Sequence, residues 1–186
     1  MPGLIAAALV ALAGATGSHL APSGLVYSSA NARVIQRQPA AGSCKPLGSG
    51  LNERPDRRCT PGAVNPAVTQ STIDSTICRS GWTATVRPPE SVTAKEKLAS
   101  LRAYGESGTS RYEYDHFVPL ELGGAVNDAR NLWPEPDYAK REGFYLNPKD
   151  RLETALKRMV CARRMTLAAA QHAIAADWVS AFARFG

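Results

Sequence analysis

Residues 112–136 read YEYDHFVPLELGGAVNDARNLWPEP, and this stretch decides the fold around which the other elements must pack. It predicts a strand over Tyr112–Val118, followed by a loop that turns at the glycine pair 123–124. A short partner strand, Asn131–Trp133, is predicted to end at Pro134, because proline interrupts the hydrogen-bond ladder of a strand. The centre of the fold is therefore expected to be a pair of neighbouring strands.

Two helices are predicted on the C-terminal side of these strands. Asn147 as N-cap and Pro148 at the first helical position begin a helix that runs to about Met159. A last helix begins at the Thr166 cap, and its apolar residues recur at steps of three and four, which predicts one buried face. That face consists of Leu167, Ala170, Ile174, Trp178 and Phe182.

An earlier helix is predicted on the N-terminal side of the strands. Thr93 and Glu96 have the spacing of a capping box, and Gly105 is placed where a C-terminal cap would be. Between residues 59 and 82 the sequence favours extended or irregular structure. Strands and helices together predict an α+β domain with several helices.

Length and composition limit the class of protein. The 186 residues suit one ordinary domain, and 44% hydrophobic with 20% charged residues is normal globular usage. Lys and Arg outnumber Asp and Glu by 22 to 16, a formal net charge of +6, which suits a polyanionic partner such as nucleic acid. The chain has no phosphate-cradling G-x-x-x-x-G-K loop, no G-x-S-x-G elbow and no H-E-x-x-H helix.

Three segments are expected along the chain. Residues 1–20 contain an apolar run that ends in small residues, which is typical of a signal peptide and shorter than the roughly 20 apolar residues of a membrane-spanning helix. Residues 21–58, rich in Gly, Ser, Pro and Ala, are expected to be a flexible linker or loosely held arm. Residues 59–186 are expected to form the folded domain, a secreted monomer without a membrane segment in its mature form.

Four cysteines follow the expected signal peptide. Their spacing contains no C-x-x-C pair and does not resemble a zinc ribbon or finger. In an exported chain they predict two disulfides, for which three pairings are possible. We favour Cys44–Cys59, which closes a loop-rich segment, with Cys78–Cys161, which ties the middle of the chain to the C-terminal helices.

The Asp115–His116 pair is the strongest candidate for chemistry. Neutral imidazole, with an unperturbed pKa of about 6.5, is suited to accept a proton near neutral pH. A carboxylate offers a hard oxygen ligand to Mg²⁺ or a similar ion. Both side chains are expected at the end of one strand.

The ordered set Asp115, His116, Pro119, Gly123, Gly124, Asn131 and Leu132 resembles the first half of an HNH endonuclease motif. The likeness extends over roughly residues 59–178, through CTPGAVN, TIC followed by GW, NLWPEP, KDRLE and the late VC, AQ and DW, to a bacterial and phage family of exported HNH-like proteins. The resemblance implies a ββα-metal active site, in which two short antiparallel strands and a helix hold one divalent ion.

The resemblance also implies roles for individual residues. His116 would be the general base, Asn131 would fix the orientation of the loop and the base, and Asp115 would be the first metal ligand. No histidine follows Asn131 to supply the last ligand, so Asp150 or Glu153, three apart on one helix face, would take that place. Both carboxylates could instead form surface ion pairs.

These features together predict a metal-dependent endonuclease that hydrolyses DNA, or alternatively RNA, with Mg²⁺ or with Mn²⁺ or Zn²⁺ in its place. Lys149 and Arg151 would contact the scissile phosphate. The alternative is a secreted nucleic-acid-binding protein that keeps the scaffold without turnover. A carbohydrate hydrolase using Glu113 and Asp115 is disfavoured, because the two lie on one strand with no acid predicted opposite them.

Overall fold

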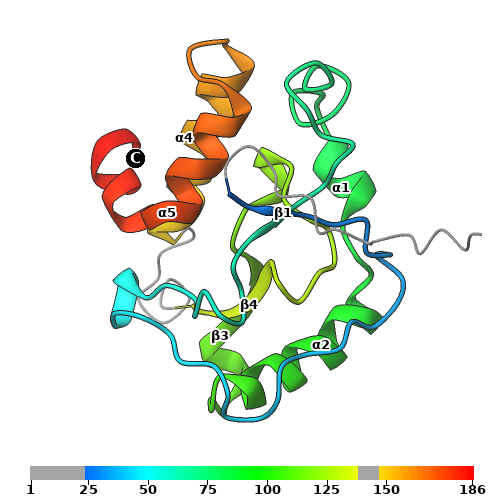
Figure 1. The fold of residues 1–186 in the computed structure, drawn as a ribbon, viewed down its shortest axis with the longest axis vertical. Coiled ribbons are helices and arrows are strands. Elements are labelled where there is room, and N and C mark those ends of the chain that lie inside the picture. The colour runs from blue at the N-terminus through cyan, green and yellow to red at the C-terminus, as the bar shows by residue number, and fades with distance from the viewer. Residues whose placement is uncertain (1–23, 138–146) are drawn as a thin grey trace, which may run out of the picture.

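The computed structural model describes residues 24–137 and 147–186. Over these ranges the chain forms a small α+β domain with four α-helices and two two-stranded sheets, which confirms the expected class. The helices are α1 (Trp82–Val86), α2 (Glu90–Ala103), α4 (Pro148–Cys161) and α5 (Leu167–Phe185), and the strands are β1 (Val26–Tyr27), β2 (Ala63–Val64), β3 (Tyr112–His116) and β4 (Leu132–Pro136). In Figure 1 the β3–β4 pair lies between α4 and α5, toward the upper left, and α2, at the bottom.

Strands β3 and β4 pair antiparallel, with Tyr112 opposite Pro136 and His116 opposite Leu132. The predicted strand pair is confirmed, but its bounds differ from those expected. β4 continues through Pro134. Each strand of a two-stranded sheet has one open edge, and a proline is tolerated there because its missing N–H is not needed for a hydrogen bond between the strands. β3 ends at His116 rather than Val118, whose N–H donates to the side chain of Asn131 instead.

Helices α4 and α5 begin where the sequence predicts and pack against each other. Asn147 is the N-cap of α4, and Thr166 Oγ1 accepts from Ala169 N at 3.1 Å at the start of α5. The predicted apolar face of α5 is buried from Leu167 to Trp178, and Phe182 packs against the same core. A kink at Asp177, whose backbone is extended (φ −162°, ψ 94°), divides α5 into two helical parts.

Helix α2 starts four residues earlier than the sequence predicts, at Glu90 with Pro89 as N-cap, and ends before Gly105 as expected. The predicted capping box is wrong, because Thr93 lies inside the helix. Glu96 is fully buried, and its Oε1 accepts from Gln36 N at 2.6 Å and from Asn127 Nδ2 at 3.2 Å. Glu96 therefore does not cap the helix but joins α2 to the segments that contain Gln36 and Asn127.

The folded unit includes the described part of the expected arm, residues 24–58. Leu25 is 1% exposed, and β1 pairs parallel with β2 through Val26 and Ala63. The arm is therefore packed on the domain rather than loosely held. No helix in the described parts of the chain is long and apolar enough to cross a membrane, and the expected signal peptide lies outside the described residues.

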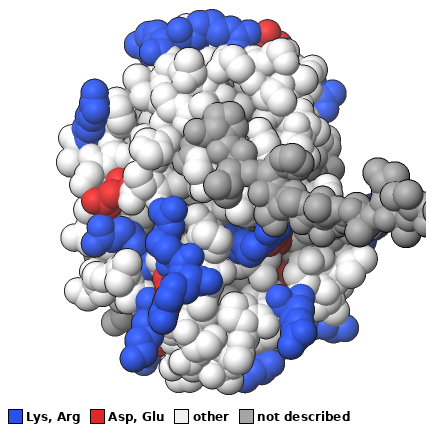
Figure 2. Space-filling model, in the orientation of Figure 1, with Lys and Arg blue, Asp and Glu red and all other residues white. Residues whose placement is uncertain are grey.

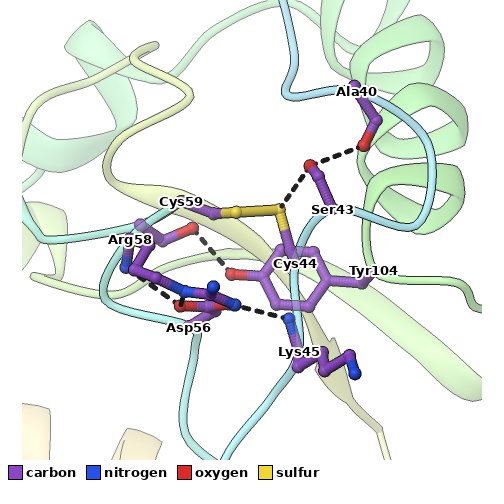
Figure 3. The surroundings of a disulfide bond; sticks show 9 residues. Ala40, Ser43, Cys44, Lys45, Asp56, Arg58, Cys59 and Tyr104 are labelled. Carbon is purple, nitrogen blue, oxygen red and sulfur yellow. Dashed lines mark hydrogen bonds and ion pairs between the residues drawn. A yellow bond between two sulfur atoms is a disulfide. The ribbon is translucent and has the colours of Figure 1, made fainter.

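Both favoured disulfides are present. Cys44–Cys59 closes a short loop in the arm, and Figure 3 shows Asp56 beside it, where its carboxylate accepts from Lys45 N at 2.8 Å and from the Arg58 guanidinium. Cys78–Cys161 joins the segment before α1 to the last residue of α4, 83 residues away. The disulfides thus fasten both the arm and the C-terminal helices to the core.

Candidate active site

One face of the β3–β4 sheet carries three carboxylates. Glu113 and Asp115 are two residues apart on β3, so their side chains project from the same face. Glu135 lies directly opposite Glu113 on β4, and its side chain is only 6% exposed. Like charges directly opposite one another destabilise a sheet, so this face requires a cation.

Lys149, in the first turn of α4, supplies that cation. Its side chain is completely buried, and Nζ donates to Asp115 Oδ2 at 2.5 Å, to Glu153 Oε1 at 2.7 Å and to the His116 carbonyl at 2.9 Å. Glu135 Oε2 lies 3.2 Å from the same nitrogen. Carboxylates from β3, β4 and α4 therefore converge on one ammonium group.

Three carboxyl groups share one ammonium group in this cluster, and the pKa values of the cluster reflect this ratio. Burial alone would lower the pKa of Lys149, but Asp115, Glu135 and Glu153 raise it well above its ordinary value. Burial raises the pKa of Glu153 to about 8, and nearby Asp115 adds to the effect. Burial disfavours the charged form of Asp115 too, but Lys149 keeps the pKa of this carboxyl below its ordinary value.

The two helix carboxylates predicted as metal ligands have different surroundings. Glu153 meets Asp115 at the ammonium group, as described above. Asp150 Oδ2 accepts from Asn147 N at 3.1 Å and so caps the start of α4. Asn147 Nδ2 in turn donates to Glu113 Oε1 at 2.6 Å, which attaches the helix start to β3.

His116, at the end of β3, is 7% exposed, and its Nε2 lies 3.1 Å from the carbonyl oxygen of Val126. A carbonyl can only accept a hydrogen bond, so Nε2 carries the proton and Nδ1 keeps a free lone pair. No described residue forms a hydrogen bond with Nδ1. Burial lowers the pKa of His116, and the ring is therefore neutral near pH 7.

Asn131 is fully buried and joins the ends of the loop between the two strands. Its Oδ1 accepts from Val118 N at 2.9 Å, and its Nδ2 donates to Val118 O at 2.9 Å and to Ala125 O at 3.1 Å. Gly124 is required here, because a Cβ at this position would lie 1.8 Å from Val118 O and 2.9 Å from Asn131 Nδ2. The loop that carries Val126 is thus fixed by one amide side chain.

The structure does not bring the two predicted phosphate-binding residues together. Lys149 is buried among carboxylates and has no exposed surface with which to contact a phosphate. Arg151 is exposed, and its guanidinium lies 5.4 Å from the centre of the Phe182 ring of α5. Residues two apart on a helix do not share a face, which explains the separation.

The predicted metal ligands, Asp115 with one helix carboxylate, lie together among the described residues but do not belong to a larger group of ligands. Within residues 24–137 and 147–186, no group of three or more His, Cys, Asp or Glu side chains is arranged to hold a metal ion. Asp115 and Glu153 are hard oxygen donors of the kind that Mg²⁺ prefers, and they do converge. The point of convergence is taken by Lys149 Nζ, while Asp115 remains 23% exposed.

Sequence reasoning missed Glu135 and the role of Lys149. Ending the second strand at Pro134 removed Glu135 from the sheet, and with it the pairing with Glu113. If the strand is continued through the proline, Glu113 and Glu135 face each other beside Asp115. Three neighbouring acids on one sheet face indicate that a cation lies among them.

Comparisons with known proteins give no further guidance: no family model, curated protein or solved structure matches this chain.

Proposed function

We propose that this chain is an exported, metal-dependent endonuclease of the HNH type, with His116 as general base and Asp115 as the first metal ligand. The observation that carries the proposal is the arrangement at the end of β3. There the neutral imidazole of His116 is bound through Nε2 to the Val126 carbonyl. The residue before it, Asp115, shares the ammonium group of Lys149 with the helix carboxylate Glu153.

The proposed role of His116 follows from its tautomer. With Nε2 donating to Val126 O, Nδ1 can remove a proton from a water molecule. The water oxygen then bonds to phosphorus while the bond from phosphorus to the leaving 3′ oxygen breaks. Asn131 acts indirectly, because it fixes the loop whose carbonyl orients the ring.

Asp115 and Glu153 would hold the metal, since they are the strand and helix carboxylates that already converge on one cation. A divalent ion, with Mg²⁺ favoured over Mn²⁺ or Zn²⁺, would stabilise negative charge on the phosphate and on the leaving oxygen. With β3, β4 and α4 in sequence order, these residues fit the ββα-metal interpretation.

A polyanionic substrate suits the charge of the chain. The net charge is +6, and Figure 2 shows basic side chains spread over one face with few acidic ones among them. DNA is the favoured substrate and RNA the alternative. Two disulfides and the apolar segment 1–20 support export to an oxidising compartment, where we expect the protein to act as a monomer.

The test is nicking of supercoiled plasmid with added Mg²⁺, comparing the parent with His116→Ala and with His172→Ala, an exposed histidine on α5, as the matched control. We expect His116→Ala to lose at least about 100-fold in rate, the usual contribution of a general base. His172→Ala should match the parent. Equal rates for all three proteins, or no cleavage by the parent with any of several metals and nucleic acids, would contradict the proposal.

The second candidate is a secreted nucleic-acid-binding protein without turnover. It is favoured by one observation, the ammonium of Lys149 at the point where the predicted metal ligands converge. Binding that weakens steeply with salt, together with no cleavage in any metal, would identify this function.

A further inference from the structure

The position of Lys149 is unusual for a lysine. It is the second residue of α4, where the helix dipole disfavours positive charge, and its side chain has no exposed surface. Burying an ammonium is costly unless charge and hydrogen bonding compensate for lost water. Here the compensation comes from Asp115, Glu153 and Glu135 and from the carbonyl oxygen of His116.

Two of these partners are the carboxylates that the proposed function requires as metal ligands. The Nζ atom lies 2.5 Å from Asp115 Oδ2 and 2.7 Å from Glu153 Oε1. A divalent ion that used both carboxylates could not share that point with an ammonium, because two cations at such short range repel strongly.

We propose that Lys149 is a built-in counter-ion that competes with the divalent metal, so that Lys149 leaves Asp115 and Glu153 when the metal binds. The inference rests on the proposed metal dependence. In the metal-free protein, Lys149 neutralises the carboxylate face and keeps α4 attached to β3. A dipositive ion replaces it only by outcompeting these ion pairs, which lowers the affinity of the site for metal.

The first experiment uses the unmodified chain. Trace reductive methylation with formaldehyde and a borane, followed by mass spectrometry, measures the accessibility of each lysine amine with EDTA and with Mg²⁺. We expect Lys149 to be labelled much more slowly than Lys157 in EDTA, because Lys157 is partly exposed. Mg²⁺ should raise labelling of Lys149 several-fold and leave Lys157 unchanged.

The second experiment compares Mn²⁺ binding by calorimetry in the parent, Lys149→Met and Lys157→Met. Lys157→Met makes the same change on the same helix, at a residue that pairs with Glu121 instead. Competition predicts about tenfold tighter Mn²⁺ binding by Lys149→Met, a size typical of coupling between two sites, and no change in Lys157→Met. If Lys149→Met does not fold, Lys149→Met with Glu135→Gln removes one buried negative charge and serves in its place.

The results separate this inference from the proposed function. Metal-dependent nicking with Lys149 still protected from labelling, or with unchanged affinity in Lys149→Met, would overturn the competition and leave the nuclease proposal standing. No nicking by the parent, but metal binding by Lys149→Met, would support the competition and contradict the nuclease. Absence of metal binding in both proteins would overturn the inference.

Discussion

Asn131 shows how one buried side chain determines the shape of a loop. It forms hydrogen bonds with both backbone groups of Val118 and with the carbonyl of Ala125, and all of these atoms are removed from water. Removing the amide leaves them without partners. We predict that Asn131→Ala lowers the free energy of unfolding by about 3 kcal/mol, as expected when buried polar groups lose their hydrogen bonds.

Urea unfolding followed by circular dichroism measures this loss, with Asn65→Ala as the matched control. Asn65 Oδ1 also accepts a backbone N–H, from Ala67, but in an exposed turn. Its replacement should cost well under half as much. A similar loss in both variants would show that Asn131 has no special structural role.

Glu153 gives the protein a stability that depends on pH. Its pKa is raised to about 8 by burial in the folded protein, against 4.5 in the unfolded chain, so the folded state holds the proton over the intervening range. Stability from this group is therefore lost as pH rises through that range. His116, with a lowered pKa, acts in the opposite direction only below 6.5.

We predict that the free energy of unfolding, measured in EDTA, falls by an amount on the order of 1 kcal/mol between pH 6.5 and 8. Glu153→Gln should reduce this slope, and the part that remains belongs to Glu113, whose pKa burial raises to about 7. Glu121→Gln, which changes a carboxylate that pairs with Lys157 away from the cluster, should leave it as in the parent. A slope in Glu153→Gln as steep as in the parent would contradict a contribution from Glu153.

At the scale of elements, the sequence predicted those whose ends have a local chemical cause. Asn147 and Pro148 begin α4 and Thr166 begins α5, because caps act within a few residues of themselves. The same reasoning gave a wrong prediction for Glu96, which is not part of a capping box. Its partners, Gln36 and Asn127, are 60 and 31 residues away, and no local pattern reveals them.

The kink in α5 is an element feature that the regular apolar spacing concealed. Asp177 Oδ2 accepts from the hydroxyl of Ser180 at 2.7 Å, and Oδ1 accepts from Val179 N at 3.2 Å and from Arg54 at 2.9 Å. Asp177 thus begins the second part of the helix as an N-cap would. We predict that Asp177→Ala costs about 1 kcal/mol, the usual value of such a cap.

Asp74→Ala is the control for Asp177→Ala in thermal unfolding. Asp74 also pairs with an arginine, Arg163, but both side chains are half or more exposed, and exposed ion pairs contribute little. The melting temperature should therefore fall for Asp177→Ala and stay near that of the parent for Asp74→Ala. Equal effects would mean that Asp177 acts only as a surface charge.

At the scale of the whole molecule, the largest difference from expectation is the arm. Its Gly, Ser and Pro content predicted a linker, yet residues 24–58 are held by β1, by Cys44–Cys59 and by Glu96 and Asn127. Composition predicts the flexibility of an isolated segment, but it does not show whether another part of the protein offers a surface on which the segment can pack. The candidate site was also predictable only in part. A local motif indicated Asp115, His116 and Asn131, whereas the carboxylates around Lys149 could be recognised only from the strand pairing.

The two disulfides should contribute unequally to stability. In the chain-entropy account the gain grows with the length of the closed loop, and the separations are 15 residues for Cys44–Cys59 and 83 for Cys78–Cys161. We predict losses of about 3 kcal/mol for the first pair and above 4 kcal/mol for the second when both cysteines of a pair become serine. Urea unfolding of the two double variants checks the order, and a larger loss for the first pair would contradict it.

The Cys78–Cys161 bond encloses β3, β4 and the whole of α4 within one covalent ring. A protease that cut the chain once between these cysteines would produce two fragments that stay joined until a reductant is added. Such a nicked molecule would be heavier only by the added water and, with its packing intact, would keep the parts of its site. The proposed export would expose the chain to proteases, and this ring would then hold both parts of a singly cut chain together.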